Sequence, residues 1–288
     1  LGQVTYSDFN DTMDKASLST SNLPIPEAGT HYEAWYLAQG GETRRNIGSI
    51  SISDSGQGQL VFIDPEEANI LGSFDQIEIT VEPDNDPNPN ESSGEIIASS
   101  VYPPFALVHV RHLVYQFSAA PDQIALIQGL WLGAESISTS TQSLEQAFDD
   151  KDETLVRLHT EELINQLAGN ANKNLYADWN QDGKINDPSD GYGLMENGEP
   201  GYSDQGYIPQ AISHAQFSAQ AIDATNEIKT QSQYVIVSIN NMQGWSEQLL
   251  AQAIKLQEMP FGSDMEAVIA EITKLSGQIV SGTDSNDN

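Results

Sequence analysis

The feature of this sequence that most constrains its fold is a change of pattern at two adjacent prolines, Pro103 and Pro104. Before them, short runs rich in β-branched and aromatic residues alternate with turns rich in Gly, Asn, Asp and Ser. After them, apolar residues recur at the spacing of helices. Proline is tolerated in a linker or a first helical turn, but not inside a helix. The sequence therefore predicts an α+β chain, with a β domain over residues 1–101 and a helical domain over residues 102–280.

The first hundred residues predict short antiparallel strands. The runs lie at residues 31–38, 46–53, 59–64, 76–83 and 94–100, with an earlier strand near QVTYSDF. The turns QGGE and DSGQG and the acidic connection DNDPNPNESSG separate them. Strands of this length and spacing are typical of a sandwich or barrel, and we expect an antiparallel β-sandwich.

The second part predicts a helical bundle. The helical runs lie at residues 105–117, 121–148, 150–169, about 207–226, about 228–258 and about 263–280. Gly169 is a natural helix stop, and Ser263 or Asp264 offers an N-cap for the last helix. The polar tail at residues 281–288 is predicted to be disordered.

A long connection at residues 170–206 contains the stretch DWNQDGKINDPSDG, which resembles the start of an EF-hand or dockerin-like calcium loop. In such loops, side-chain oxygens come from positions 1, 3 and 5, which here are Asp178, Asn180 and Asp182. Gly183 stands at position 6, where the turn is sharp, and Lys184 would supply its backbone carbonyl at position 7. The spacing predicts a structural Ca²⁺ site that orders this connection.

The end of the loop departs from the EF-hand pattern. Position 12 is Ser189 rather than an acidic residue, so another carboxylate must close the site. Asp190 is the first candidate, because a bend at Pro188 would let it close the site, and Asp187 is the second. Ile185, at position 8, is expected to hold the loop against the core. An acidic surface loop would explain the turns, but not the alternate spacing of the oxygen ligands.

The charge of the chain limits its partners. There are 42 acidic and 11 basic residues, for a net charge of −31. Binding to nucleic acid or to anionic membrane surfaces needs clustered Lys and Arg, so neither is expected. The acidity fits a solvated surface, a demand for divalent cations or a salty habitat. There is no Cys, which excludes disulfides, thiol nucleophiles and thiolate metal sites.

No catalytic motif is recognisable in the sequence. G-x-S-x-G, H-E-x-x-H, P-loop and dinucleotide fingerprints are absent, so we expect a protein that is not an enzyme. Four of the five histidines, His109, His112, His159 and His214, fall in predicted helices. They could converge on a transition metal or haem, although histidines satisfied by hydrogen bonds are the simpler interpretation.

The N-terminal third resembles the extracytoplasmic C-terminal domain of anti-sigma-K factors. The resemblance lies in the segments LPIPEAGTHYEAWYL, NIGSISI, FDQIEITVEPDNDPNPN and GEIIASS. Its motif residues are Tyr32 and Trp35 in an early strand, and Thr80, Glu82 and Pro83 at the end of a late strand. The resemblance implies a β-sandwich located outside the cytoplasmic membrane.

These features together predict a non-enzymatic bacterial protein that is exported to the cell envelope or the extracellular space. No apolar run approaches the roughly 18 residues that a membrane helix requires, and the first residues, LGQVTYSDFN, resemble neither a signal peptide nor a lipid anchor. We expect a calcium-binding structural or interaction role, with protein partners or self-assembly. The alternatives are a sensory ectodomain of an anti-sigma-like system and a metal or haem carrier.

Overall fold

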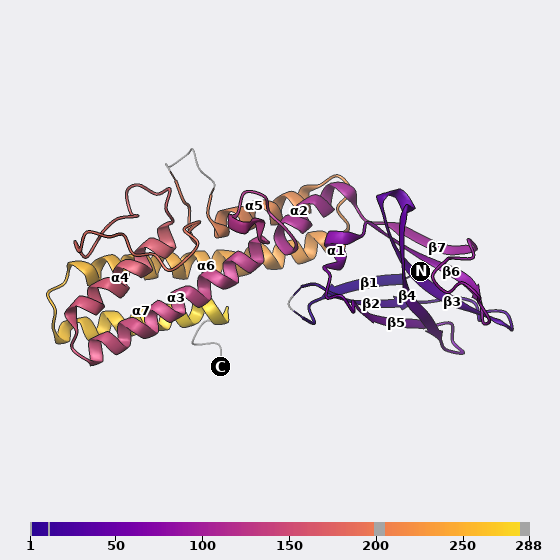
Figure 1. Cartoon of the computed structure of the whole chain (residues 1–288), viewed down its shortest axis with the longest axis horizontal. Helices are drawn as coiled ribbons and strands as arrows, with labels where there is room; N and C mark the ends of the chain where they lie inside the picture. Colours follow the sequence, from indigo (N-terminus) through magenta and orange to yellow (C-terminus); the bar gives the residue numbers. More distant parts are fainter. Residues whose placement is uncertain (1, 11, 199–204, 283–288) are drawn as a thin grey trace. The chain divides into compact units, whose positions relative to one another are not determined.

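The computed structural model describes residues 2–10, 12–198 and 205–282 (Figure 1). The chain divides into two compact units, Leu1–Tyr115 and Gln116–Asn288. The first unit extends past residue 101, the boundary expected from the sequence, and includes the helix Pro104–Val114. Each unit is described by itself.

The described part of the first unit contains one seven-stranded antiparallel sheet. Its strands are β1 (Gly2–Ser7), β2 (Lys15–Thr20), β3 (Thr30–Ala38), β4 (Thr43–Ile52), β5 (Gly58–Ile63), β6 (Gln76–Pro83) and β7 (Ile96–Val101), in the order β1-β2-β5-β4-β3-β6-β7. The antiparallel β prediction is confirmed. The division into two separate sheets is not, because β4 pairs with both β3 and β5 and makes the sheet continuous.

The junction between β4 and β5 is narrow. Only Ser51 and Ile52 of β4 pair with β5, at Gln59 and Gly58. Beyond these pairs, the guanidinium of Arg45 on β4 donates to both carboxylate oxygens of the buried Asp64, which follows β5, at 2.6 and 3.1 Å. An ion pair thus continues the connection where the backbone ladder stops.

The sheet curls around an apolar core. Alternate residues of β3, including Tyr32, Ala34 and Tyr36, join buried residues of β2, β4 and β6 in this core. The hydroxyls of Tyr6 on β1 and Tyr102, just after β7, are in contact, and their ring centroids are 5.8 Å apart. Side chains from the two ends of the sheet therefore meet inside the curl.

Two helices complete the first unit, α1 (Ile70–Ser73) and α2 (Pro104–Val114). Asn69 caps α1 by accepting from the Gly72 amide at 2.8 Å. Arg111 of α2 donates to the carbonyl oxygens of Leu71 and Phe74 at 2.7 and 3.1 Å. A basic side chain at the carbonyl end of α1 thus joins the two helices.

Five helices form the described core of the second unit. They are α3 (Leu126–Asp149), α4 (Glu153–Ala168), α5 (Tyr207–Gln220), α6 (Asn226–Glu258) and α7 (Glu266–Ser281). Gly169 ends α4 with a φ of 73°, as the sequence predicts. Pro121 begins a 3₁₀ turn (Pro121–Gln123), and α3 itself begins at Leu126. Residues 263–265, where the N-cap was expected, form another 3₁₀ turn before α7.

The helices of this unit pack along their lengths (Figure 1). Helix α3 contacts α4, α5 and α7, and α6 contacts the same three helices. The interior contains fully buried apolar side chains from all five helices, including Ile137, Leu163, Ala211, Leu249 and Ile272. Arg157 of α4 closes the end of α6 by donating to the carbonyl oxygens of Leu256, Gln257 and Met259 at 2.6–2.9 Å. No described helix is long and apolar enough to cross a membrane.

The predicted disordered tail falls almost entirely outside the described residues. Ser281 ends α7, and Gly282 follows in a left-handed conformation with a φ of 69°. Residues 283–288 are not described.

Candidate functional site

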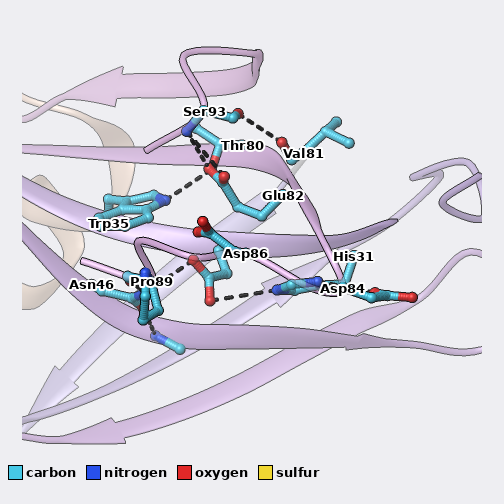
Figure 2. Close-up of polar contacts among 12 residues, drawn as sticks. His31, Trp35, Asn46, Thr80, Val81, Glu82, Asp84, Asp86, Pro89 and Ser93 are labelled. Atoms are coloured by element: carbon cyan, nitrogen blue, oxygen red, sulfur yellow. Dashed lines mark hydrogen bonds and ion pairs between the residues drawn. The ribbon is translucent and has the colours of Figure 1, made fainter. Parts of the chain in front are cut away.

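The outer face of β3 and β6 carries a chain of buried polar contacts (Figure 2). The indole N–H of Trp35 donates to the hydroxyl of Thr80 at 2.8 Å, and that hydroxyl donates to Glu82 at 2.5 Å. Both oxygens of Glu82 accept from the Ser93 amide, at 3.1 and 3.0 Å. Trp35, Thr80 and Glu82 are each at most 1% exposed. Three residues of the family resemblance therefore lie in one hydrogen-bonded chain.

Hydrogen bonds hold the connection between β6 and β7 against this face of the sheet. Besides the contact at Ser93, Asn46 on β4 donates to the carbonyl oxygen of Pro89 at 2.8 Å (Figure 2). Glu82 and Asn46 lie on the two strands that flank β3, so the connection crosses β3. His31 lies 3.2 Å from Asp84, at the start of the connection. The expectation that this acidic stretch joins two strands is confirmed.

Acidic groups on the same face have their own partners. The Arg44 guanidinium lies 2.8 Å from Glu78 and 6.0 Å from the ring centre of Trp35. Asn46 donates to Glu33 at 2.9 Å. Each carboxylate is thus held by a partner and is largely buried, so these groups stabilise the outer face of the sheet.

The calcium loop predicted in the second unit adopts a tightly turned conformation. Asp178 accepts from the amides of Asp182 and Gly183 at 3.1 and 2.9 Å, and Asn180 also accepts from the Asp182 amide at 2.9 Å. Asp182 accepts from the Lys184 amide at 2.8 Å. The oxygens of Asp178 and Asn180 therefore meet at the Asp182 amide, and coordination of Ca²⁺ by positions 1, 3 and 5 stays a prediction.

The two candidate closing acids face other partners. Asp187 accepts from the amide and hydroxyl of Ser189, at 2.9 and 2.6 Å. Asp190 accepts from the Tyr192 amide and from the Tyr207 hydroxyl, at 2.9 and 2.5 Å. Among the described residues of this loop, no three acidic side chains bring ligand oxygens within 4.8 Å of one another. Which acid would close a calcium site stays a prediction.

Burial and the neighbouring acids act on two tyrosines of this region. Burial raises the pKa of the Tyr207 phenol, and the hydrogen bond to Asp190 raises it further. Burial also raises the pKa of Tyr176, helped by the charge of Asp187. Both phenols are therefore protonated at neutral pH and able to donate.

Helix α4 holds the loop through two buried side chains that the sequence pattern does not reveal. The carboxylate of Glu161 accepts from the amides of Asn180 and Asn186 at 2.9 and 2.7 Å. One turn later, Asn165 accepts from the Ala177 amide at 3.0 Å and donates to the carbonyl oxygens of Ala177 and Asn186. Glu161 and Asn165 have no exposed surface. They clamp the two ends of the segment that contains the predicted ligands.

The expectation that Ile185 holds the loop against the core is wrong. Its side chain is 50% exposed, and the polar clamp from α4 takes that role. Farther along the connection, the amides of Leu194 and Met195 donate to the carbonyl oxygens of Gln166 and Leu167 at the end of α4. Protein contacts thus order much of the described connection.

The two histidines of the second unit have close neighbours. His159 lies 2.8 Å from Glu162 on the same helix. His214 is buried, with its ring centroid 5.1 Å from that of Phe117 and 5.8 Å from that of Phe217. Binding of a metal or haem by the histidines stays a prediction.

The curled sheet and its fixed polar face define the first unit as an antiparallel β domain whose outer face is held by buried, hydrogen-bonded carboxylates. Residues 2–96 match the model of the family described as anti-sigma-K factor rskA, C-terminal. The match covers about a third of the chain and lies within the first unit. The resemblance of the N-terminal third is therefore confirmed. No curated protein and no solved structure matches the chain.

Proposed function

We propose that this chain is a non-enzymatic regulatory protein whose first unit acts outside the cytoplasm by binding another protein. The observation that carries the proposal is the match of residues 2–96 to the C-terminal domain of anti-sigma-K factors. The chain of contacts from Trp35 through Thr80 to Glu82 supports it, because these motif residues fix the outer face of the matched domain. The compartment and the partner are both parts of the proposal.

Deletion of the gene in its host, followed by transcript profiling, tests the regulatory role. We expect a set of genes that share a promoter element to change expression, and to recover when the gene is restored. Cell fractionation would place the protein outside the cytoplasm. An unchanged transcript profile, or a cytoplasmic protein, would count against the proposal.

We also propose that residues 178–190 bind Ca²⁺ in the second unit, where the ion would support a structural or assembly role at the cell surface. The convergence of Asp178 and Asn180 on the Asp182 amide favours this candidate. Lys184 would add its backbone carbonyl, and Asp187 or Asp190 would have to reorient to close the site. In a chain with a net charge of −31, cations would also reduce repulsion between copies.

Trp179 lies between two of the predicted ligands and provides a probe for this site. Tb³⁺ bound at the loop should luminesce when the indole is excited, and Ca²⁺ should displace it. Elemental analysis should give one calcium per chain, and a chelator should lower the melting temperature and disperse any assembly. An Asp178→Asn, Asp182→Asn double variant should lose these effects, whereas Asp149→Asn, an exposed acid on α3, should keep them. A melting temperature that changes with neither calcium nor chelator would refute the calcium site.

A further inference from the structure

Strand β7 forms one end of the sheet and, within the described part of the chain, pairs only with β6. The Tyr102 amide donates inward to the carbonyl oxygen of Asp75 at 2.8 Å. Ladder hydrogen bonds alternate along an antiparallel strand, so the backbone groups of Ser99 and Val101 face away from β6. A register shift near Ile97 limits the regular free edge to the second half of the strand.

This edge is apolar and lacks the usual protection against strand pairing. Ile96, Ile97 and Val101 are 49%, 38% and 63% exposed, and the sequence IIASSV contains no charge and no proline. The opposite edge strand, β1, contributes no large exposed apolar side chain among its described residues. The two ends of the sheet therefore differ, and β7 is the end suited to accept another strand.

The charge around the edge indicates what kind of strand fits. Glu91 and Glu95, both exposed, precede β7 in the connection from β6. A second copy of the chain would bring the same acids together and would add a further net charge of −31. A segment with Lys or Arg among alternating apolar residues complements both the acids and the exposed side chains.

We propose that the outer edge of β7 binds an extended basic segment of a partner protein as an additional antiparallel or parallel strand. Backbone hydrogen bonds to Ser99 and Val101 would provide the affinity, and the apolar side chains beside them would provide the register. The proposal rests on the proposed regulatory role, for which it names the surface and the chemistry of the partner.

The acetylated and amidated peptide KVTVKVTVK serves as the probe, with the full chain observed by NMR. The amides of Ser99 and Val101 should exchange rapidly in the free protein and at least about tenfold more slowly with the peptide. A peptide with Glu in place of Lys, and one with a central Pro, should leave them unprotected. Protection of both amides in the free protein, accompanied by a doubled mass, would indicate pairing with a second copy and overturn the proposal.

Two variants locate the binding edge. Ser99→Pro removes an outward N–H without removing a hydrogen bond to β6, so peptide affinity should fall by about tenfold. Ser99→Ala retains the N–H and should bind as the unchanged protein does. Val101→Lys places a positive charge on the exposed edge, and should weaken binding of the basic peptide even if the proline variant folds poorly.

Equal affinity of the unchanged protein and the Val101→Lys variant would overturn the assignment of the site to β7. Absence of any binding by the probe would overturn the proposed partner chemistry. Neither result depends on the gene deletion, so a regulatory phenotype without peptide binding would reject this surface and leave the regulatory role standing.

Discussion

Thr80 lies at the centre of the polar chain in the first unit and has no exposed surface. Its hydroxyl accepts from Trp35 and donates to Glu82, so both neighbours depend on one oxygen atom. Valine has nearly the same shape as threonine but can neither accept nor donate a hydrogen bond through its side chain. At this scale, the stability of the matched domain depends on satisfying buried polar groups as well as on apolar packing.

Thr80→Val should lower the free energy of unfolding by about 2 kcal/mol, because the buried Trp35 N–H and the Glu82 carboxylate each lose a partner. Urea unfolding followed by circular dichroism measures the change. Thr5→Val, at an exposed position on β1, should change stability by less than about 0.5 kcal/mol. Equal effects of the two substitutions would mean that the buried chain contributes little.

Glu161→Gln should destabilise the second unit by about 2 kcal/mol, because a charged acceptor of two loop amides becomes a neutral amide. The change should also increase amide exchange at Asn180 and Asn186, which mass spectrometry or NMR would detect. Glu153→Gln, on the exposed first turn of the same helix, is the matched control. Unchanged exchange at both amides would show that Glu161 does not hold the loop.

The residues of the loop that resembles a calcium-binding loop can be identified from the sequence, but Glu161 and Asn165, which hold the loop, cannot. The spacing of Asp178, Asn180 and Asp182 is local, so a short pattern reveals it. Glu161 bonds to amides 19 and 25 residues farther along the chain. Helical periodicity shows that Glu161 and Asn165 share a face, but it does not show what that face meets.

At the scale of elements, most strands and helices follow from the sequence because their apolar patterns are strong. The sequence does not predict strand β2, because KASLST places only Ala16 and Leu18 in the core, amid small and polar residues. It does not predict helix α1, because that helix has only four residues. The sequence predicts two sheets instead of one. Only two residue pairs join β4 to β5, and nothing in the sequence of these residues indicates that the two strands pair.

Close packing of α3 on α5 depends on Gly129. A Cβ at this position would overlap the ring of Tyr207, whereas a Cβ at Gly244 on α6 would meet nothing within 4 Å. Gly129→Ala should therefore destabilise the second unit by about 2 kcal/mol or more, and Gly244→Ala should stabilise it by about 0.5–1 kcal/mol. Thermal unfolding of the two variants tests the contrast. Stabilisation by both substitutions would show that Tyr207 moves aside without penalty.

The curl of the sheet should weaken in alkali. Burial is the main cause that raises the pKa values of Tyr6, Tyr36 and Tyr102 above the ordinary value, and the neighbouring Tyr102 and Tyr36 raise that of Tyr6 further. A raised folded pKa gives stability that is complete below the unfolded pKa of about 10 and is lost as the pH rises above it. The loss should approach about 1.4 kcal/mol per pH unit for each such tyrosine.

Chemical unfolding between pH 8 and pH 12, with phenol ionisation followed by ultraviolet absorbance, measures this loss. Tyr102→Phe should reduce the slope, because one of the three titrating groups is removed. Free titration of all tyrosines near pH 10, with the sheet intact, would contradict the assignment.

At the scale of the whole molecule, the chain consists of two compact units, and each contains its own tryptophan residues. Trp35 is the tryptophan of the first unit, and Trp131, Trp179 and Trp245 belong to the second. Both the family match and the tyrosine cluster lie in the first unit, whereas the candidate calcium loop lies in the second. The two proposed roles are therefore physically separable within one chain.

Calcium should raise the unfolding temperature of the second unit and leave that of the first unchanged, because a ligand stabilises only the folded unit that binds it. Calorimetry would detect the shift, and a variant that retains Trp35 as its sole tryptophan would assign the unaffected transition. An equal shift in both transitions would indicate that the units unfold together.

The narrow junction between β4 and β5 also gives the sheet a mechanical character. Two residue pairs and the Arg45–Asp64 ion pair join β4 to β5 along this border, whereas β3 and β4 are paired along most of their lengths. Under tension between the halves, we expect this border to separate first, because it has the fewest paired residues among the strand pairs of the sheet. The two halves of the sheet would then move apart, while the strands within each half stay paired.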